Sequence, residues 1–299
     1  MRHIFKGMEK IKNSKIGIVC HDAGGAEIIS NWVYFNNSKN KFYYSLKGPS
    51  LKIFKKNKIF FKNLNLRELI KKIDILFAGT SLKSYHEIEA IREAKKKGVK
   101  IYSFLDHWIN YKERFLRRKK FFFPNIIVVS DKYSFNIANK IFDCPVVKEK
   151  NFYFERVKKM SKKKNDNKKT NLKILYLSSN NDLNIKKNYT KDRIILSKTI
   201  KFFSLNKRKI QFNIRKHPSE NYKKYFFIKR KEMSKIKIYF DKNKKLTESI
   251  LKSDIVVGYD SMGIVIAHLL NRKTYNIKLP NKNEKNVIPK IFFSSYLKI

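Results

Sequence analysis

The chain has 299 residues, enough for two modest domains that each enclose a hydrophobic core. Two cysteines are too few for a disulfide framework, and each stands alone in an apolar context, so we expect buried thiols in a reducing cytoplasm. No apolar signal segment opens the chain and no stretch approaches the roughly 18 apolar residues that span a bilayer. We therefore expect a cytoplasmic protein, peripheral at most at the inner face of a membrane.

The charge is strongly positive, with 70 Lys and Arg against 24 Asp and Glu and a net charge of +46. Such a balance suggests nucleic acid, but the lysines are spread evenly, and no zinc-finger spacing, helix-turn-helix or aromatic RNA-binding pattern accompanies them. We expect solvated lysines and no specific nucleic-acid partner. The remaining positive surface favours anionic partners such as sugar nucleotides and acidic lipid headgroups.

Short apolar runs alternate with helical patterns through the first half of the chain. This alternation predicts a parallel sheet with helices on both faces. In order, the predicted elements are strand 15–20, helix 28–35, strand 41–48, segment 58–64, helix 66–73, strand 74–80, helix 84–98, strand 100–108, strand 125–131, helix 132–142 and strand 144–150.

A charged segment without apolar periodicity, residues 156–171, then predicts a linker. After it the alternation restarts, with strand 172–179, helix 191–206, strand 209–218, strand 235–240, helix 246–253, strand 254–260, helix 261–271 and a closing strand 273–279. The fold class is thus α/β, with two Rossmann-like domains, 1–155 and 172–299, that face a central cleft. Ligands of such sheets lie beyond the carboxyl ends of the strands.

Polar residues collect at the predicted strand ends of the first domain. Strand 15–20 runs into a glycine-rich turn whose backbone allows close approach of a ligand. The alternative is that the aspartate of the glycine-rich turn caps the next helix and its histidine is a surface residue. Likewise, the aspartate near the end of strand 100–108 would cap a turn beside a core tryptophan. The residues concerned are His21, Asp22, Gly24, Gly25, Glu27, Thr80, Ser81, Asp106, His107 and Trp108.

Two strand ends of the second domain carry comparable groups. Pro218 ends one strand and holds His217 at its tip, where an imidazole can donate to a phosphate oxygen of a leaving nucleotide. Ser261 begins the helix after another strand, where its hydroxyl and the free amides of the helix can hold a phosphate. The alternatives are a strand-end histidine held by the fold and, at Asp260 or Ser261, a simple helix cap.

The stretches IRKHPSE (214–220) and DIVVGYDSMGIVIAHLLNRKTYNI (254–277) resemble the HP and Ser motifs of GT-B glycosyltransferases that use CMP-activated sugars. This family includes bacterial sialyltransferases and capsule enzymes, and CDP-glycerol glycerophosphotransferases share a similar pair. The resemblance implies that His217 and Ser261, on neighbouring strand ends, hold the phosphate of a cytidine nucleotide, with Glu220 at the ribose or base. It extends the donor site to Ser178, Pro218, Met262 and Gly263.

The stretches HDAGGAE and FLDHWINYKERF resemble a subgroup of such proteins associated with surface polysaccharides. The resemblance places the acceptor and the catalytic base in the N-terminal domain. Asp22 is our first choice for the base, with Asp106 and His21 as rivals, and Gly24, Gly25, Glu27, Thr80, Ser81 and His107 line the acceptor side.

The predicted function is transfer of a sugar, such as a sialic-acid-like nonulosonate, from a CMP-linked donor to a glycan or lipid-linked acceptor. No metal and no cofactor besides the CMP-sugar substrate are expected. Alternatives are a CDP-glycerol-type glycerophosphotransferase, a GT-B-like nucleotide-sugar epimerase, and a basic protein that binds nucleic acid or a membrane without catalysis.

Overall fold

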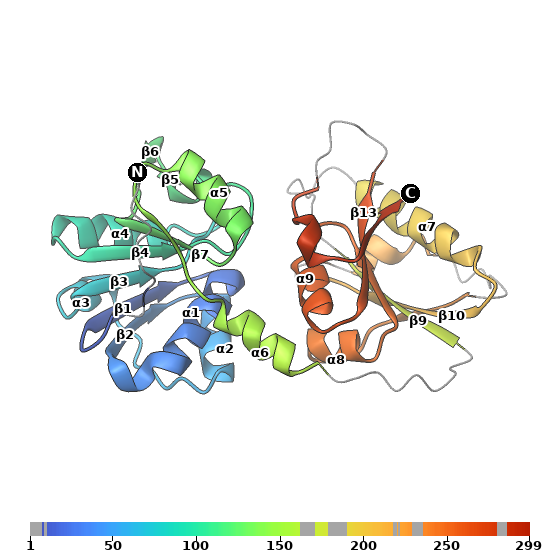
Figure 1. The fold of residues 1–299 in the computed structure, drawn as a ribbon, viewed down its shortest axis with the longest axis horizontal. Helices are drawn as coiled ribbons and strands as arrows, with labels where there is room; N and C mark the ends of the chain where they lie inside the picture. Colours follow the sequence, from blue (N-terminus) through green and yellow to red (C-terminus); the bar gives the residue numbers. More distant parts are fainter. Residues whose placement is uncertain are drawn as a thin grey trace. The chain divides into compact units, whose positions relative to one another are not determined.

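The computed structural model describes residue 8 and residues 11–161, 171–178, 190–217, 220, 222–228, 236–279 and 286–299. The chain divides into two compact units, here called unit 1 (Met1–Glu155) and unit 2 (Arg156–Ile299). In each unit the described residues form one six-stranded parallel sheet flanked by helices (Figure 1). This architecture confirms the predicted α/β class with two parallel-sheet domains. Among the described helices, none has the length and apolar character needed to span a membrane.

In the sheet of unit 1, the first strand along the chain is not an edge strand, because it has a neighbour on each side. In spatial order it contains β2 (Lys41–Leu46), β1 (Lys15–Cys20), β3 (Ile75–Ala78), β4 (Lys100–Phe104), β7 (Ile126–Val129) and β8 (Val146–Lys148). All neighbouring pairs are parallel, so every strand presents its carboxyl end at the same edge. A two-stranded hairpin, β5 (Leu116–Arg117) with β6 (Lys120–Phe121), lies outside this sheet.

Side chains alternate along β1 between two cores. Ile16 and Ile18 pack with Trp32 of the first helix, whereas Val19 packs on the other face with Leu69 and Ile91. The helices on the first face are α1 (Ala23–Asn36) and α2 (Pro49–Lys56), and those on the second are α3 (Leu66–Ile70), α4 (His86–Lys96) and α5 (Lys132–Ile141). The burial of both faces explains why the strands are almost entirely apolar.

The sheet of unit 2 has the same design. In spatial order it contains β11 (Ile236–Phe240), β10 (Lys209–Arg215), β9 (Asn171–Leu177), β12 (Ile255–Gly258), β13 (Lys273–Lys278) and β14 (Ser295–Lys298). One face packs against α7 (Thr190–Ser204), and the other carries α9 (Met262–Leu269) with α8 (Leu246–Leu251) beside it. Short 3-10 turns complete the described elements: η2 (Asn37–Lys39), η3 (Glu113–Phe115), η4 (Tyr222–Tyr225) and η5 (Lys290–Phe292).

Three features differ from the sequence prediction. Residues 156–159, assigned to the linker, are the end of helix α6 (Phe152–Lys159), because Val157 is buried and Phe152 stacks on Phe35 at 5.0 Å. The remaining linker residues 162–170 lie outside the described part. Helix α2 was not predicted, because its sequence is rich in lysine and Phe54 is its one buried large apolar residue. Strand 273–279 does not close the sheet, since β14 pairs along its outer edge.

Candidate functional site

A histidine and an aspartate meet where β1 gives way to α1. His21 Nδ1 lies 2.6 Å from Asp22 Oδ1, and both side chains are only partly buried. Asp22 occupies the N-cap position of α1, but within the described residues its side chain makes no capping hydrogen bond. The predicted alternative, a simple cap, is therefore wrong here. A carboxylate beside an imidazole is a pair that can take up and release a proton.

Glu87 is the member of this group that sequence reasoning missed. Its side chain is buried at 2 % exposure, and Oε1 accepts the backbone N–H of His21 at 2.7 Å. Burial raises the pKa of this carboxyl from 4.5 to about 7. Among the described residues, its Oε2 has no hydrogen-bond partner. A signal existed in the sequence, because Glu87 shares the buried face of α4 with Ile91 and Ala94 at helical spacing.

Asp106 at the end of β4 belongs to a different arrangement. Its Oδ1 accepts from Arg114 Nη1 at 2.7 Å, and the same nitrogen donates to Thr80 Oγ1 at 3.0 Å. Arg114 and Thr80 are both buried, so this ion pair is largely shielded from water. Trp108 is a core residue that donates to Asp131, which agrees with the predicted packing alternative for the tryptophan. Asp106, however, is tied to a buried guanidinium and not to a turn.

Two glycines bring these strand ends against α1. A Cβ on Gly24 would lie 1.7 Å from Asp106 Oδ2, so that carboxylate rests directly on the first turn of α1. A Cβ on Gly25 would lie 3.2 Å from Gly79 Cα, where α1 approaches the end of β3. The unpaired amides at a helix start favour negative charge. The glycine-rich turn thus brings a carboxylate and a helix start together.

The other residues predicted for the acceptor side have local partners. Glu27 pairs with Lys56 of α2 at 3.2 Å, and Ser81 Oγ accepts the N–H groups of Lys83 and Ser84. His107 is edge-on to Trp108, with ring centroids 5.5 Å apart. Their roles toward an acceptor stay predictions.

In unit 2, three strand ends lie in register. Leu177 of β9 pairs with Arg215 of β10 on one side and with Gly258 of β12 on the other. His217 follows β10 and Ser261 follows β12, so the strand that separates them is β9. The prediction that they stand on neighbouring strand ends is wrong, because β9, the first strand of this unit along the chain, inserts between β10 and β12. Their strands are about 10 Å apart, twice the usual strand spacing.

Ser261 is the N-cap of α9, and its Oγ accepts the N–H of Gly263 at 3.3 Å. Asp260 before it has a φ of 44°, a left-handed conformation that costs energy in a residue other than glycine. Hydrogen bonds hold it there, since Oδ1 accepts from Asn276 at 2.8 Å and the Asp260 N–H donates to Asn276 Oδ1 at 3.0 Å. The predicted capping alternative is thus what the structure contains, and a phosphate contact by Ser261, Met262 and Gly263 stays a prediction.

The segment around His217 is fixed by a buried charge network. The His217 N–H donates to Glu220 Oε2 at 2.8 Å, while Glu220 Oε1 accepts from Lys224 Nζ at 2.5 Å. Lys224 Nζ also lies 2.6 Å from Asp192 Oδ2 and 3.1 Å from Ser178 Oγ. Glu220 was predicted to contact a ribose or base, yet both its oxygens are engaged within the chain.

Two predicted donor residues remain, and the structure describes one of them. Ser178 is buried in the network, where it also donates to Glu220 at 3.1 Å, and Pro218 lies outside the described residues. The described residues contain no cluster of three or more His, Cys, Asp or Glu side chains arranged to hold a metal ion. The structure therefore offers two groups of polar residues, one at the strand ends of each unit.

No protein-family model matches the chain, and no curated protein sequence matches it. Solved structures do resemble it over nearly the whole length. An S. aureus MnaA–UDP co-structure is 13 % identical, with 89 % of this chain and 79 % of that chain covered and a TM-score of 0.63. The UDP-GlcNAc 2-epimerase of Methanocaldococcus jannaschii in complex with UDP-GlcNAc and UDP is 11 % identical, covers 88 % and 83 %, and has a TM-score of 0.57. MurG of Acinetobacter baumannii is 7 % identical, covers 89 % and 79 %, and has a TM-score of 0.51. The chain shares the two-sheet GT-B fold of these proteins.

Proposed function

We propose that the chain is an enzyme that acts on a nucleotide-diphosphate sugar, with epimerisation of the sugar as its reaction. The observation that carries the proposal is the group His21, Asp22 and Glu87, which combines an imidazole–carboxylate pair with a carboxyl whose pKa is raised to about 7. Inverting a C–H centre requires one group to remove a proton and another to return one on the opposite face. A carboxyl whose pKa lies near neutrality, as that of Glu87 does, suits such a proton transfer.

The arrangement in unit 2 supports a diphosphate more than a single phosphate. His217 and Ser261 follow strands separated by β9, with about 10 Å between those strands. Two linked phosphoryl groups bridge such a span more easily than one. The start of α9 and the His217 side chain would then stabilise negative charge on the nucleotide if its bond to the sugar loosens during the reaction.

The resemblance in fold supports the same substrate class. Proteins of this fold include UDP-GlcNAc 2-epimerases, one of them solved with UDP-GlcNAc and UDP. For this chain, UDP-N-acetylglucosamine is accordingly the first substrate to test. A CMP-specific donor is the weaker expectation, since its only support is the pair of short motifs.

Sugar transfer from a CMP-linked donor is the second candidate function. The HP and Ser stretches favour it, and a general base for an acceptor hydroxyl is available in Asp22 or Asp106. A MurG of the same fold shows that this architecture is not confined to epimerases.

Solvent deuterium separates the two reactions. The enzyme is incubated in D2O with UDP-GlcNAc, other UDP-sugars or CMP-sialic acid, and the recovered sugar is analysed by mass and proton NMR. We expect deuterium at the inverted carbon with a UDP-sugar, and a loss of more than about tenfold in rate, or about 1.4 kcal/mol, in His217→Ala. Hydrolysis or transfer of the CMP-sugar with no deuterium gain would instead establish the second candidate.

A further inference from the structure

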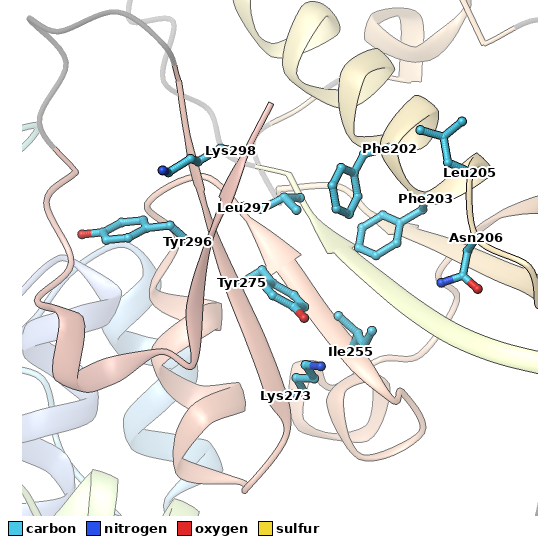
Figure 2. A pocket seen from close by; sticks show the side chains of 10 residues that line it. All are labelled: Phe202, Phe203, Leu205, Asn206, Ile255, Lys273, Tyr275, Tyr296, Leu297 and Lys298. Carbon is cyan, nitrogen blue, oxygen red and sulfur yellow. The ribbon is translucent and has the colours of Figure 1, made fainter.

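One face of unit 2 combines exposed apolar side chains with a cluster of cations. Phe202 is 46 % exposed at the end of α7, and Leu205 just beyond the helix is 80 % exposed. They lie beside a cavity of about 640 Å³ bordered by the end of α7 and by strands β12, β13 and β14 (Figure 2). We call Phe202, Leu205 and this cavity the α7 groove.

The floor of the α7 groove is partly apolar. Tyr275, Ile255 and Leu297 contribute to it from three adjacent strands, and Phe203 of α7 closes its inner side (Figure 2). Lys273 stands on the same side of β13 as Tyr275, with its Nζ 5.5 Å from the centre of that ring. An aromatic ring with a cation above it suits the boundary between a hydrocarbon layer and water.

Charge completes the pattern. Exposed cations flank the exposed Phe202 and Leu205 along the chain, and stretches 201–209, 273–279 and 290–299 contain no Asp or Glu. The exposed cations of the first stretch and of the groove are Lys201, Lys207, Arg208, Lys209, Lys273 and Lys298. Anionic lipid headgroups attract such a cluster, while Phe202 and Leu205 can enter the layer beneath the headgroups.

We propose that the α7 groove is a docking surface for an anionic lipid bilayer. Phe202 and Leu205 insert at the headgroup–acyl boundary, and Lys207, Arg208 and Lys273 contact lipid phosphates. The surface lies on the sheet face that carries α7, whereas the Ser261 turn leads into α9 on the opposite face. Docking is therefore independent of the proposed reaction, and its test contains no nucleotide.

The test is flotation of the full chain with vesicles of phosphatidylcholine alone or mixed with phosphatidylglycerol. A charge of +46 attracts the protein to anionic vesicles wherever its lysines lie, so the decisive variant is Phe202→Ser/Leu205→Ser, which leaves the charge unchanged. We expect wild type to float only with anionic vesicles, and the variant to lose at least about fivefold in vesicle partitioning. Leu205→Ser alone, at a largely exposed position outside the helix, should show part of the loss even if the double variant folds poorly.

Two matched controls fix the location. Phe60→Ser removes a 96 % exposed phenylalanine between Lys58 and Lys62 in unit 1, and should leave partitioning unchanged. Lys207→Glu/Arg208→Glu should weaken partitioning more than Lys71→Glu/Lys72→Glu, which changes the net charge equally.

Three results would overturn the proposal. Failure of anionic vesicles to retain the wild type would exclude docking. Equal partitioning of wild type and the serine variants, or an equal loss in Phe60→Ser, would assign binding to charge or to exposed apolar groups in general. Loss of a dimer in Phe202→Ser/Leu205→Ser, seen by sedimentation velocity with unchanged vesicle binding, would assign the groove to a second copy of the chain.

Discussion

The end of β10 in unit 2 and the end of β1 in unit 1 differ in how a buried charge is compensated. At the end of β10 in unit 2, the buried Lys224 ammonium group lies between the carboxylates of Glu220 and Asp192, and Glu220 in turn holds the backbone of His217. At the end of β1 in unit 1, the buried Glu87 has no cation of comparable closeness among the described residues, and its pKa rises to about 7. A compensated network fixes a geometry, whereas an uncompensated carboxyl remains free to exchange a proton.

This difference suggests that the two units have different roles in the proposed reaction. Unit 2 would supply a fixed frame that holds an anionic group of the substrate. Unit 1 would supply the groups that gain and lose protons. The predictions below test that contrast, from the largest expected effect to the smallest.

Lys224→Met should cause the largest loss of stability. The variant leaves Glu220 and Asp192 buried without their cation, at 6 % and 4 % exposure, and breaking a buried pair from one side costs about 3–5 kcal/mol. Urea unfolding measures the free energy of unfolding. The exposed neighbour Lys223→Met is the control and should change it by less than about 0.5 kcal/mol. Equal small losses in both variants would mean that the network does not stabilise unit 2.

Glu87→Gln tests the opposite case, in which removing a charge stabilises the fold. Between pH 4.5 and about 7 the unfolded carboxyl has lost its proton while the folded one keeps it, so stability falls as pH rises through this window and is level above it. The glutamine variant lacks this slope. Relative to wild type, it should gain up to about 3 kcal/mol between pH 4.5 and pH 8.

Urea unfolding of both proteins across this pH range measures the gain. Burial lowers the pKa of His86, so protonation of His86 destabilises the folded state of both proteins in acid. This effect is the same in both proteins and cancels in the comparison. A pH-independent difference between the two proteins would show that Glu87 is already charged when folded. In the proposed reaction, the variant should also flatten the acidic limb of the rate profile.

Gly24→Ala should disturb the carboxylate that rests on α1. The new methyl group would lie 1.7 Å from Asp106 Oδ2, so Asp106 must move away from Arg114, at a cost of about 1–3 kcal/mol. A double-mutant cycle with Asp106→Ala measures the coupling. The alanine at position 24 should cost much less once the carboxylate is gone. Additive effects would mean that the clash is relieved elsewhere.

Much of the fold followed from the sequence because parallel strands buried on both faces are almost purely apolar, as in β1 and β7. The spatial order of the strands could not be predicted from the sequence. The position of β9 between the strands that precede His217 and Ser261 was therefore missed. The same limit hid the partners of Asp106 and Glu220. In the sequence, nothing distinguishes Arg114 and Lys224 from the other members of a set of 70 Lys and Arg residues. Their burial, which separates them from exposed cations, is visible only in the structure. The predicted cleft and the ligand roles of the site residues stay predictions.

Ser261→Ala should have the smallest effect on stability and the most specific effect on binding. Loss of the hydrogen bond from the Gly263 N–H to Ser261 Oγ removes a helix cap, which costs about 1 kcal/mol. If this residue also contacts a nucleotide phosphate, affinity for UDP in calorimetry should fall by about fivefold, a further 1 kcal/mol.

Asn65→Ala is the matched control in unit 1. Its Oδ1 caps α3 through the Glu68 N–H at 2.9 Å, so it should lose similar stability with unchanged affinity for UDP. Ser261→Asp separates the two roles at one position, because aspartate caps a helix as well as serine but repels a phosphate. Stability near wild type with lost UDP binding would assign Ser261 to the ligand, whereas retained binding in both Ser261 variants would leave it a cap alone.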